Sequence, residues 1–168
     1  MTVIIWNQFG IQETFLGKNK TMFDNIYKGK KVLITGHTGF KGSWLATWLL
    51  NLGAEVYGYS IDIPSVPSHF VELGLENKMV SVFGDVKDFH EFKKFTDEHK
   101  PEVVFHLAAQ PIVRQSFANP METIHTNVMG VTNVLESART VDYIKSLVII
   151  TSNKCYDNVE WTFGYREI

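Results

Sequence analysis

The sequence lacks the features that mark secreted, membrane-spanning or nucleic-acid-binding proteins. It has one cysteine, Cys155, in 168 residues, so no internal disulfide can form and a reducing, cytoplasmic compartment fits best. No apolar run approaches the roughly 20 residues of a membrane helix, and the N-terminus has no basic start or cleavage site of a signal peptide. A net charge of -2 offers no basic excess for nucleic acid or a membrane surface. What remains is an ordinary globular composition, 45% hydrophobic and 20% charged, long enough for one domain.

Two common kinds of site are also missing from the pattern. The six histidines, at 37, 69, 90, 99, 106 and 125, have no metal-ligand spacing, so we expect no metal site. We interpret His106 as a core residue with its hydrogen bonds satisfied, not as a catalytic base. A Walker loop is absent, because Lys41-Gly42-Ser43 has the residues in the wrong order.

What is present is an alternation of short apolar segments with helical patterns. Strands are predicted at 31–35, 54–60, 79–85, 102–108 and 146–151, and helices at 40–52, 88–99 and 120–140. Gly53 ends the first helix and Pro120 lies in the first turn of the last. This order predicts βαβ units in an α/β, doubly wound parallel sheet of the Rossmann type over residues 29–168, after a poorly patterned extension at 1–28.

The first strand runs into a turn with three evenly spaced glycines, "TGHTGFKG". Gly36 permits a tight turn, Gly39 lets the backbone approach a pyrophosphate, and Gly42 lets the helix lie close to the sheet. The free N–H groups at the start of that helix favour phosphate. In this strand–turn–helix context the motif predicts a bound dinucleotide.

Further candidates follow the later strands, where ligands lie in such sheets. Asp62 comes 20 residues after Gly42, where a carboxylate would bind the adenosine ribose, and no arginine follows it, which favours NAD over NADP. Asp85 could contact adenine. The alternatives are that Asp62 caps a loop before Pro64 and that Asp85 caps the helix at 88–99. In "HLAAQ", the small Ala108 and Ala109 leave room for a flat ring.

These segments together resemble the extended short-chain dehydrogenase/reductase family. "GHTGFKGSWL", "HLAAQPIVRQSF", "TNVMGVTNVLE" and "TSNKCYDNVEWTFGYRE" resemble one branch in particular, the CDP-glucose 4,6-dehydratases, from about residue 22 to residue 167. The resemblance implies a cytoplasmic lyase with tightly held NAD. The cofactor oxidises the sugar at C4, water is lost across C5 and C6, and the hydride returns to C6. The product, CDP-4-keto-6-deoxy-glucose, is a precursor of O-antigen and other polysaccharides.

The resemblance also implies roles for individual residues. Backbone groups of Phe40 and Lys41 would lie over the pyrophosphate, Val86 beside the adenine, and Thr126 against the cofactor. In "TSNK", Ser152 would bond the sugar 4-hydroxyl, Asn153 occupies the position of an aspartate that assists loss of the C6 hydroxyl, and Lys154 would manage the C5 proton. The expected cofactor site is Gly36, Thr38, Gly39, Phe40, Lys41, Gly42, Asp62, Asp85, Val86, Leu107, Ala108, Ala109, Thr126 and Thr151, and the expected catalytic residues are Ser152, Asn153 and Lys154.

Some expected parts do not occur in these 168 residues. The family's catalytic Tyr-x-x-x-Lys lies downstream of "GYRE", and the one match here, Tyr27 to Lys31, precedes the first strand and is interpreted as chance. The sixth strand and the substrate domain are not in the sequence either. We therefore expect this chain to be a half that binds NAD without turnover. The resemblance implies CDP-glucose as the substrate of the complete enzyme, and a homodimer built through the helices at 88–99 and 120–140. The aromatic residues Trp6 and Phe9 leave open a docking of residues 1–21 onto the sheet edge.

Three functions remain open at this stage. The first is the dehydratase, present as its N-terminal portion. The second is a sugar-nucleotide 4-epimerase, which Lys154 and the "CYDN-EW" segment disfavour. The third is a non-catalytic NAD-binding module from a truncated gene, and a methyltransferase is a distant fourth.

Overall fold

The computed structural model describes residues 22–152, 159–160 and 162–164. Within them the strands are β1 (Lys31–Thr35), β2 (Glu55–Ser60), β3 (Val80–Phe83), β4 (Val103–His106) and β5 (Ser146–Ile149). The helices are η1 (Met22–Asn25), α1 (Phe40–Asn51), α2 (His69–Glu72), η2 (Leu75–Asn77), α3 (Phe89–His99), α4 (Val113–Ala118), α5 (Pro120–Ile124), η3 (His125–Met129) and α6 (Gly130–Arg139).

The strands form one parallel sheet in the order β3-β2-β1-β4-β5. Its register places Val32 beside Val56 of β2 and Val103 of β4. The chain runs outward from β1 through β2 to β3 and then returns to the other side of β1, so the direction of winding reverses between β1 and β4. The predicted Rossmann sheet is confirmed, and this reversal point is where such sheets bind ligands.

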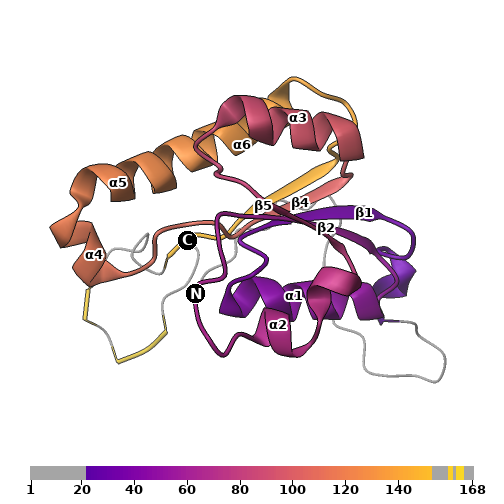
Figure 1. Cartoon of the computed structure of the whole chain (residues 1–168), viewed down its shortest axis with the longest axis horizontal. Coiled ribbons are helices and arrows are strands. Elements are labelled where there is room, and N and C mark those ends of the chain that lie inside the picture. Colours follow the sequence, from indigo (N-terminus) through magenta and orange to yellow (C-terminus); the bar gives the residue numbers. More distant parts are fainter. Residues whose placement is uncertain (1–21, 153–158, 161, 165–168) are drawn as a thin grey trace.

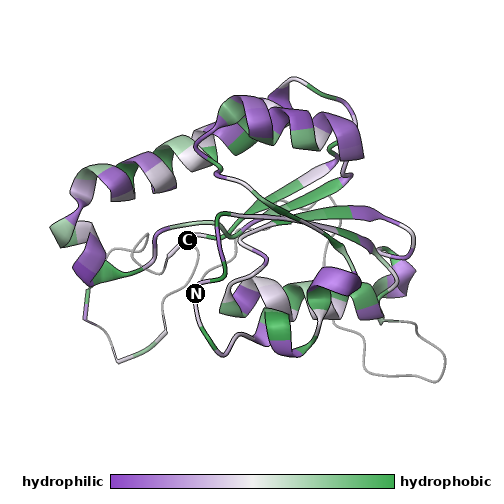
Figure 2. Cartoon of the chain, in the orientation of Figure 1, coloured by the Kyte–Doolittle hydropathy of each residue, from purple (hydrophilic) through white to green (hydrophobic). Residues whose placement is uncertain are grey.

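Helices cover both faces of the sheet. In Figure 1, α1 and α2 lie below it while α3 and α6 lie above it. The strands are mostly hydrophobic and the helices are mixed, as Figure 2 shows, which is the pattern of a sheet buried on both sides. Two apolar clusters follow, one centred on Val32, Ile34 and Leu49 and the other on Leu33, Phe92 and Phe95.

Local signals explain where several elements begin and end. Gly53 has a φ of +79° directly after α1, and Pro120 occupies the first turn of α5, as the sequence predicts. Asp88, not Asp85, caps α3, since its side chain accepts a hydrogen bond from the Glu91 N–H at 3.0 Å. The alternative interpretation of Asp85 as the cap is therefore wrong.

The helix expected at 120–140 is present as α5, η3 and α6 in succession. Its middle, His125–Met129, is a π-helical segment, which the 3.6-residue period could not indicate. The short elements α2, η2 and α4 were not expected. The extension predicted at 1–28 lies largely outside the described residues, and that boundary stays a prediction.

Candidate nucleotide site

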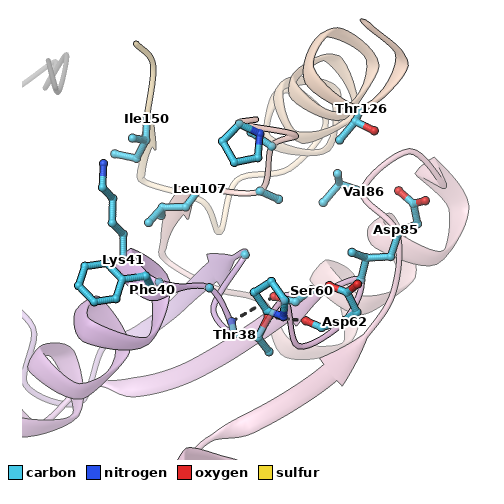
Figure 3. A pocket seen from close by; sticks show the side chains of 18 of the residues that line it. Thr38, Phe40, Lys41, Ser60, Asp62, Asp85, Val86, Leu107, Thr126 and Ile150 are labelled. Atoms are coloured by element: carbon cyan, nitrogen blue, oxygen red, sulfur yellow. Dashed lines mark hydrogen bonds between the residues drawn. The ribbon is translucent and has the colours of Figure 1, made fainter. Parts of the chain in front are cut away.

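A cavity of about 520 Å³ opens at the carboxyl ends of the strands. Figure 3 shows Phe40 and Lys41 on one side of it and Asp62, Asp85 and Val86 on the other. All fourteen residues expected to bind the cofactor line this one cavity. Six others also line it and were not expected, namely Ser60, Ile61, Pro64, Gly84, Pro111 and Ile150.

The glycine turn presents main-chain atoms, rather than side chains, to the cavity at its three glycines. Gly36 has a φ of +73°, and a Cβ placed there would come within 2.9 Å of the Ala108 nitrogen. A Cβ on Gly42 would overlap the Gly36 carbonyl oxygen. Gly39 precedes α1 and places no side-chain cap over its start, and the positive end of a helix dipole favours an anion there. The residues present therefore fit an anionic group lying against bare main chain.

Thr38 fixes the turn to the end of β2. Its hydroxyl donates to the Asp62 carbonyl oxygen at 2.6 Å, and its N–H donates to the Ser60 hydroxyl oxygen at 3.4 Å (Figure 3). The backbone of Asp62 is thereby held at the cavity rim, where the side chain lines the cavity. These contacts involve the main chain of Asp62, so the choice between ribose binding and loop capping for its carboxylate stays a prediction.

His37 secures the same turn from behind. Its Nδ1 lies 2.8 Å from the Ser60 hydroxyl and its Nε2 lies 2.7 Å from the Ser81 hydroxyl. The ring occupies space that a side chain on Gly58 would fill. Burial lowers the pKa of His37 to about 4, against a smaller raising effect of a hydrogen bond to the Tyr59 backbone, so the imidazole is neutral near pH 7.

His106 is buried as expected, but only half of its hydrogen-bonding capacity is used. Its Nδ1 lies 2.7 Å from the Thr35 hydroxyl, and among the described residues its Nε2 has no partner. The Thr35 oxygen also accepts the N–H groups of Leu107 and Ala108, both at 3.1 Å. Burial lowers the pKa of His106 to about 4. The residue thus fixes the cavity wall after β4 and is not placed as a base.

At the far end of the cavity, charged groups surround the loop after β3. The Asp85 carboxylate accepts the Lys87 N–H at 2.9 Å and lies 3.4 Å from the Lys87 ammonium. The same ammonium pairs with Glu122, which also accepts the Thr126 hydroxyl at 3.2 Å. Hydrogen bonding to Glu122 is the main reason that the pKa of Lys87 is raised.

Two asparagines of the long helix, which is formed by α5, η3 and α6, make hydrogen bonds to main-chain groups beside the cavity. The sequence analysis identified neither of them. Asn127 accepts the Gln110 N–H at 2.7 Å and donates to its carbonyl at 3.1 Å. Asn133 donates to the carbonyls of Val86 and Lys87. The signal available in the sequence was that each asparagine stands in the same triplet, Thr-Asn-Val, of "TNVMGVTNVLE".

The expected catalytic segment is only partly described. Thr151 lines the cavity, and its buried hydroxyl has no hydrogen-bond partner among the described residues. Ser152 follows it and is exposed. Asn153 and Lys154 lie outside the described residues, so their roles stay predictions. The chance match of Tyr27 and Lys31 lies at the opposite end of β1 from the cavity, where Lys31 donates to the His99 carbonyl.

Within the described ranges, no three His, Cys, Asp or Glu side chains are grouped as a metal site would need. None of the described helices has the length and apolar character to cross a membrane.

The fold and the cavity together define a Rossmann domain with a nucleotide-type pocket at its switch point. Comparison with known proteins gives the family: the model for GDP-mannose 4,6 dehydratase matches residues 33–164, and the chain belongs to this family.

Two relatives with dehydratase names are consistent with this family. The CDP-glucose 4,6-dehydratase of Salmonella typhimurium is 54% identical over 143 residues, which are 85% of this chain and 40% of that protein. The GDP-mannose 4,6-dehydratase of Vibrio cholerae is 35% identical over 66% of this chain and 31% of its own length. The chain thus spans about two fifths or less of these relatives.

Solved structures show the same architecture. An epimerase from Methanothermobacter thermautotrophicus matches with a TM-score of 0.70 and 28% identity, over 84% of this chain and 41% of its own. A UDP-glucose 4-epimerase from Stenotrophomonas maltophila, solved with bound NAD, matches with a TM-score of 0.70 and 25% identity, over 79% of this chain and 40% of its own.

Proposed function

We propose that this chain supplies the NAD-binding part of a cytoplasmic CDP-glucose 4,6-dehydratase. The observation that carries the substrate class is the 54% identity to the Salmonella dehydratase over most of the chain. The cofactor is supported by the bare-backbone cradle at the start of α1 and by the NAD bound in a structural relative. The product would be a CDP-4-keto-6-deoxy sugar of the kind used for O-antigen and other polysaccharides.

In this proposal each part of the cavity holds one part of the cofactor. The turn at Gly36–Gly42 would bind the pyrophosphate through backbone N–H groups. Asp62 would accept hydrogen bonds from the adenosine ribose, and Asp85 with Val86 would face the adenine. Leu107 to Ala109, Thr126 and Thr151 would line the remaining channel. NAD, when bound there, supplies the reversible oxidation that makes the sugar's C5 proton acidic.

Polar residues of this chain would bind the sugar and take part in its proton transfer. By resemblance, Ser152 bonds the 4-hydroxyl and Lys154 manages the proton at C5. A lysine serves as a base when burial lowers its pKa, because desolvation disfavours the ammonium form. The Tyr-x-x-x-Lys pair of the family has no counterpart at the cavity in the described residues, so we expect this chain to bind cofactor without turnover.

The same family includes relatives that support a second candidate. Several structural relatives, such as the Stenotrophomonas protein, are named sugar-nucleotide 4-epimerases. The two activities differ in the fate of the C6 hydroxyl. Incubating the complete enzyme with CDP-glucose separates them, because a 4-keto-6-deoxy product requires elimination and an epimerase gives none.

Calorimetric titration of this chain with NAD⁺ tests the cofactor site. We expect saturable binding by the wild type and at least tenfold weaker binding by Gly42→Ala, because the added Cβ displaces the turn. Gly164→Ala is the matched control, since a Cβ there meets nothing within 4 Å, and it should bind like the wild type. A folded wild type that takes up no NAD⁺ would overturn the proposal.

A further inference from the structure

The loop after β3 is held by a residue of the distant helix α6. Asn133 is buried, at 8% exposure, and its Nδ2 group donates to the carbonyl oxygens of Val86 and Lys87, both at 2.9 Å. Both protons of one amide are therefore used on two successive peptide groups. An amide with this geometry fixes the direction of the chain between Asp85 and Asp88.

The face of α6 that packs against this loop allows the main chain of the loop to approach the helix closely. Its buried residues are Gly130, Asn133, Val134 and Ser137, which are small or polar except for one valine. At Gly130 a Cβ would come within 2.9 Å of the Val86 side chain, so the valine lies directly on the helix. Asn133 thus supplies hydrogen-bond donors to the buried Val86 carbonyl and the part-buried Lys87 carbonyl, and leaving a buried carbonyl without a donor is unfavourable.

The loop is also anchored from the sheet side. The Gly84 N–H donates to the Ser60 carbonyl at 2.8 Å, and the Asp88 N–H donates to the Asp85 carbonyl at 3.0 Å. Gly84, Asp85 and Val86 all line the cavity. The loop is thus fixed at Gly84 by β2 and at Val86 and Lys87 by Asn133, with Asp85 between these attachments.

A second contact between the long helix and the loop is an ion pair at the solvent-exposed rim of the cavity. The Lys87 ammonium pairs with Glu122, whose side chain is 57% exposed. Exposed ion pairs contribute little to stability because water and salt screen them. The buried Asn133 is therefore the stronger of the two connections between the long helix and the loop.

We propose that Asn133 is a positioning residue that sets the affinity and base preference of the adenine end of the pocket. It does so through the Val86 and Lys87 carbonyls and does not touch the ligand itself. The inference rests on the proposed function, because it assumes that the base lies against Asp85 and Val86. It adds that recognition of the base depends on a helix that lies on the other side of the loop.

The test is a titration of the whole 168-residue chain with NAD⁺ and with its hypoxanthine analogue, which lacks the 6-amino group. Asn133→Leu keeps the volume and removes both donors. We expect its NAD⁺ affinity to fall about tenfold, which corresponds to about 1.4 kcal/mol, and its preference for NAD⁺ over the analogue to approach one. A purely structural role would weaken both ligands equally and leave that ratio unchanged.

Two control variants make the result specific. Ser137→Ala removes another buried polar group from the same face of α6, whose hydroxyl has no hydrogen-bond partner among the described residues, and should leave both affinities unchanged. Glu122→Gln removes the exposed ion pair and should weaken NAD⁺ less than twofold. If Asn133→Leu is folded and keeps the wild-type ratio, the inference is wrong.

A measurement on the wild type keeps the inference testable if the variant does not fold. The Nδ2 protons of Asn133, followed by NMR, should exchange slowly with solvent and more slowly still when NAD⁺ is bound. Exchange that is fast, or that NAD⁺ leaves unchanged, would overturn the inference even though NAD⁺ binds. A wild type that binds no NAD⁺ overturns the proposed function as well, so the two failures are distinguishable.

Discussion

At position 153 an asparagine stands where the dehydratases that the sequence resembles carry an aspartate. An amide is not acidic enough to transfer a proton at neutral pH, so it cannot assist the departure of the C6 hydroxyl as a carboxylic acid would. We predict that Asn153→Asp, in a complete enzyme that carries this segment, speeds the loss of water. Single-turnover measurement of the elimination step checks this, and an equal or slower rate contradicts it.

Two buried histidines predict how stability depends on pH. The pKa values of His37 and His106 are both lowered to about 4, mainly by burial, against about 6.5 in an unfolded chain. Between these values the unfolded chain binds more protons, so stability is complete above pH 6.5 and falls as the pH drops toward 4. Each histidine should remove about 2 kcal/mol from the free energy of unfolding between pH 7 and pH 5.

Urea denaturation at several pH values measures this slope. Replacing both histidines by asparagine should flatten it, even though the absolute stability also changes. The exposed His90 provides the control, because His90→Gln should leave the slope as it is. Parallel curves for the wild type and the double variant would contradict the prediction.

Among the elements, α3 shows most directly how a sequence pattern becomes packing. Of its three phenylalanines, Phe92 and Phe95 are buried at 1% and 6% exposure, while Phe89 is only half-buried. Phe92 also contacts the Tyr59 ring, edge to face at 5.3 Å. We predict that Phe92→Ala costs about 3–5 kcal/mol of unfolding free energy. Phe89→Ala should cost clearly less, and equal losses in thermal or urea unfolding would count against this account of the core.

The sequence predicts elements well where the pattern is long and has one period. The strands at 31–35 and 146–151 and the helices at 40–52 and 88–99 are confirmed within two residues at each end. The strand expected at 79–85 ends at Phe83, although the Gly84 N–H still donates to the Ser60 carbonyl of β2. Helix α2 has only four residues and α4 only six, so neither is long enough to show a helical period.

The lining of the cavity could be predicted for a related reason, while cofactor binding there stays a prediction. The fourteen expected cofactor residues lie in or beside short local motifs that follow the strands, and all fourteen line the cavity. Asn127 and Asn133 were missed because their partners lie 17 and 46 or 47 residues away. Contacts of that kind depend on how the helix lies on the sheet, which no local period contains.

For the molecule as a whole, the long helix leaves an apolar stripe uncovered. The stripe consists of Phe117, Met121, Ile124, Val128 and Leu135, which are between 48% and 83% exposed. Their spacing of three, four and seven residues places the last four on one side of the continuous helix from α5 to α6. A stripe of this kind on a solvent-exposed helix typically marks an interface between proteins, and it supports the proposed homodimer through this helix.

A charge placed within this stripe should prevent the association. We predict that Leu135→Glu shifts the protein from dimer to monomer in light scattering after gel filtration, because burying an unpaired carboxylate costs more than the contact contributes. Leu135→Met is the matched control, because it keeps an apolar side chain of similar volume at the same position, so it should stay dimeric. The variant should also bind NAD⁺ like the wild type, since Leu135 does not line the cavity. A wild type that is monomeric at the highest concentrations tested would contradict the homodimer expected from the sequence and leave the nucleotide site untouched.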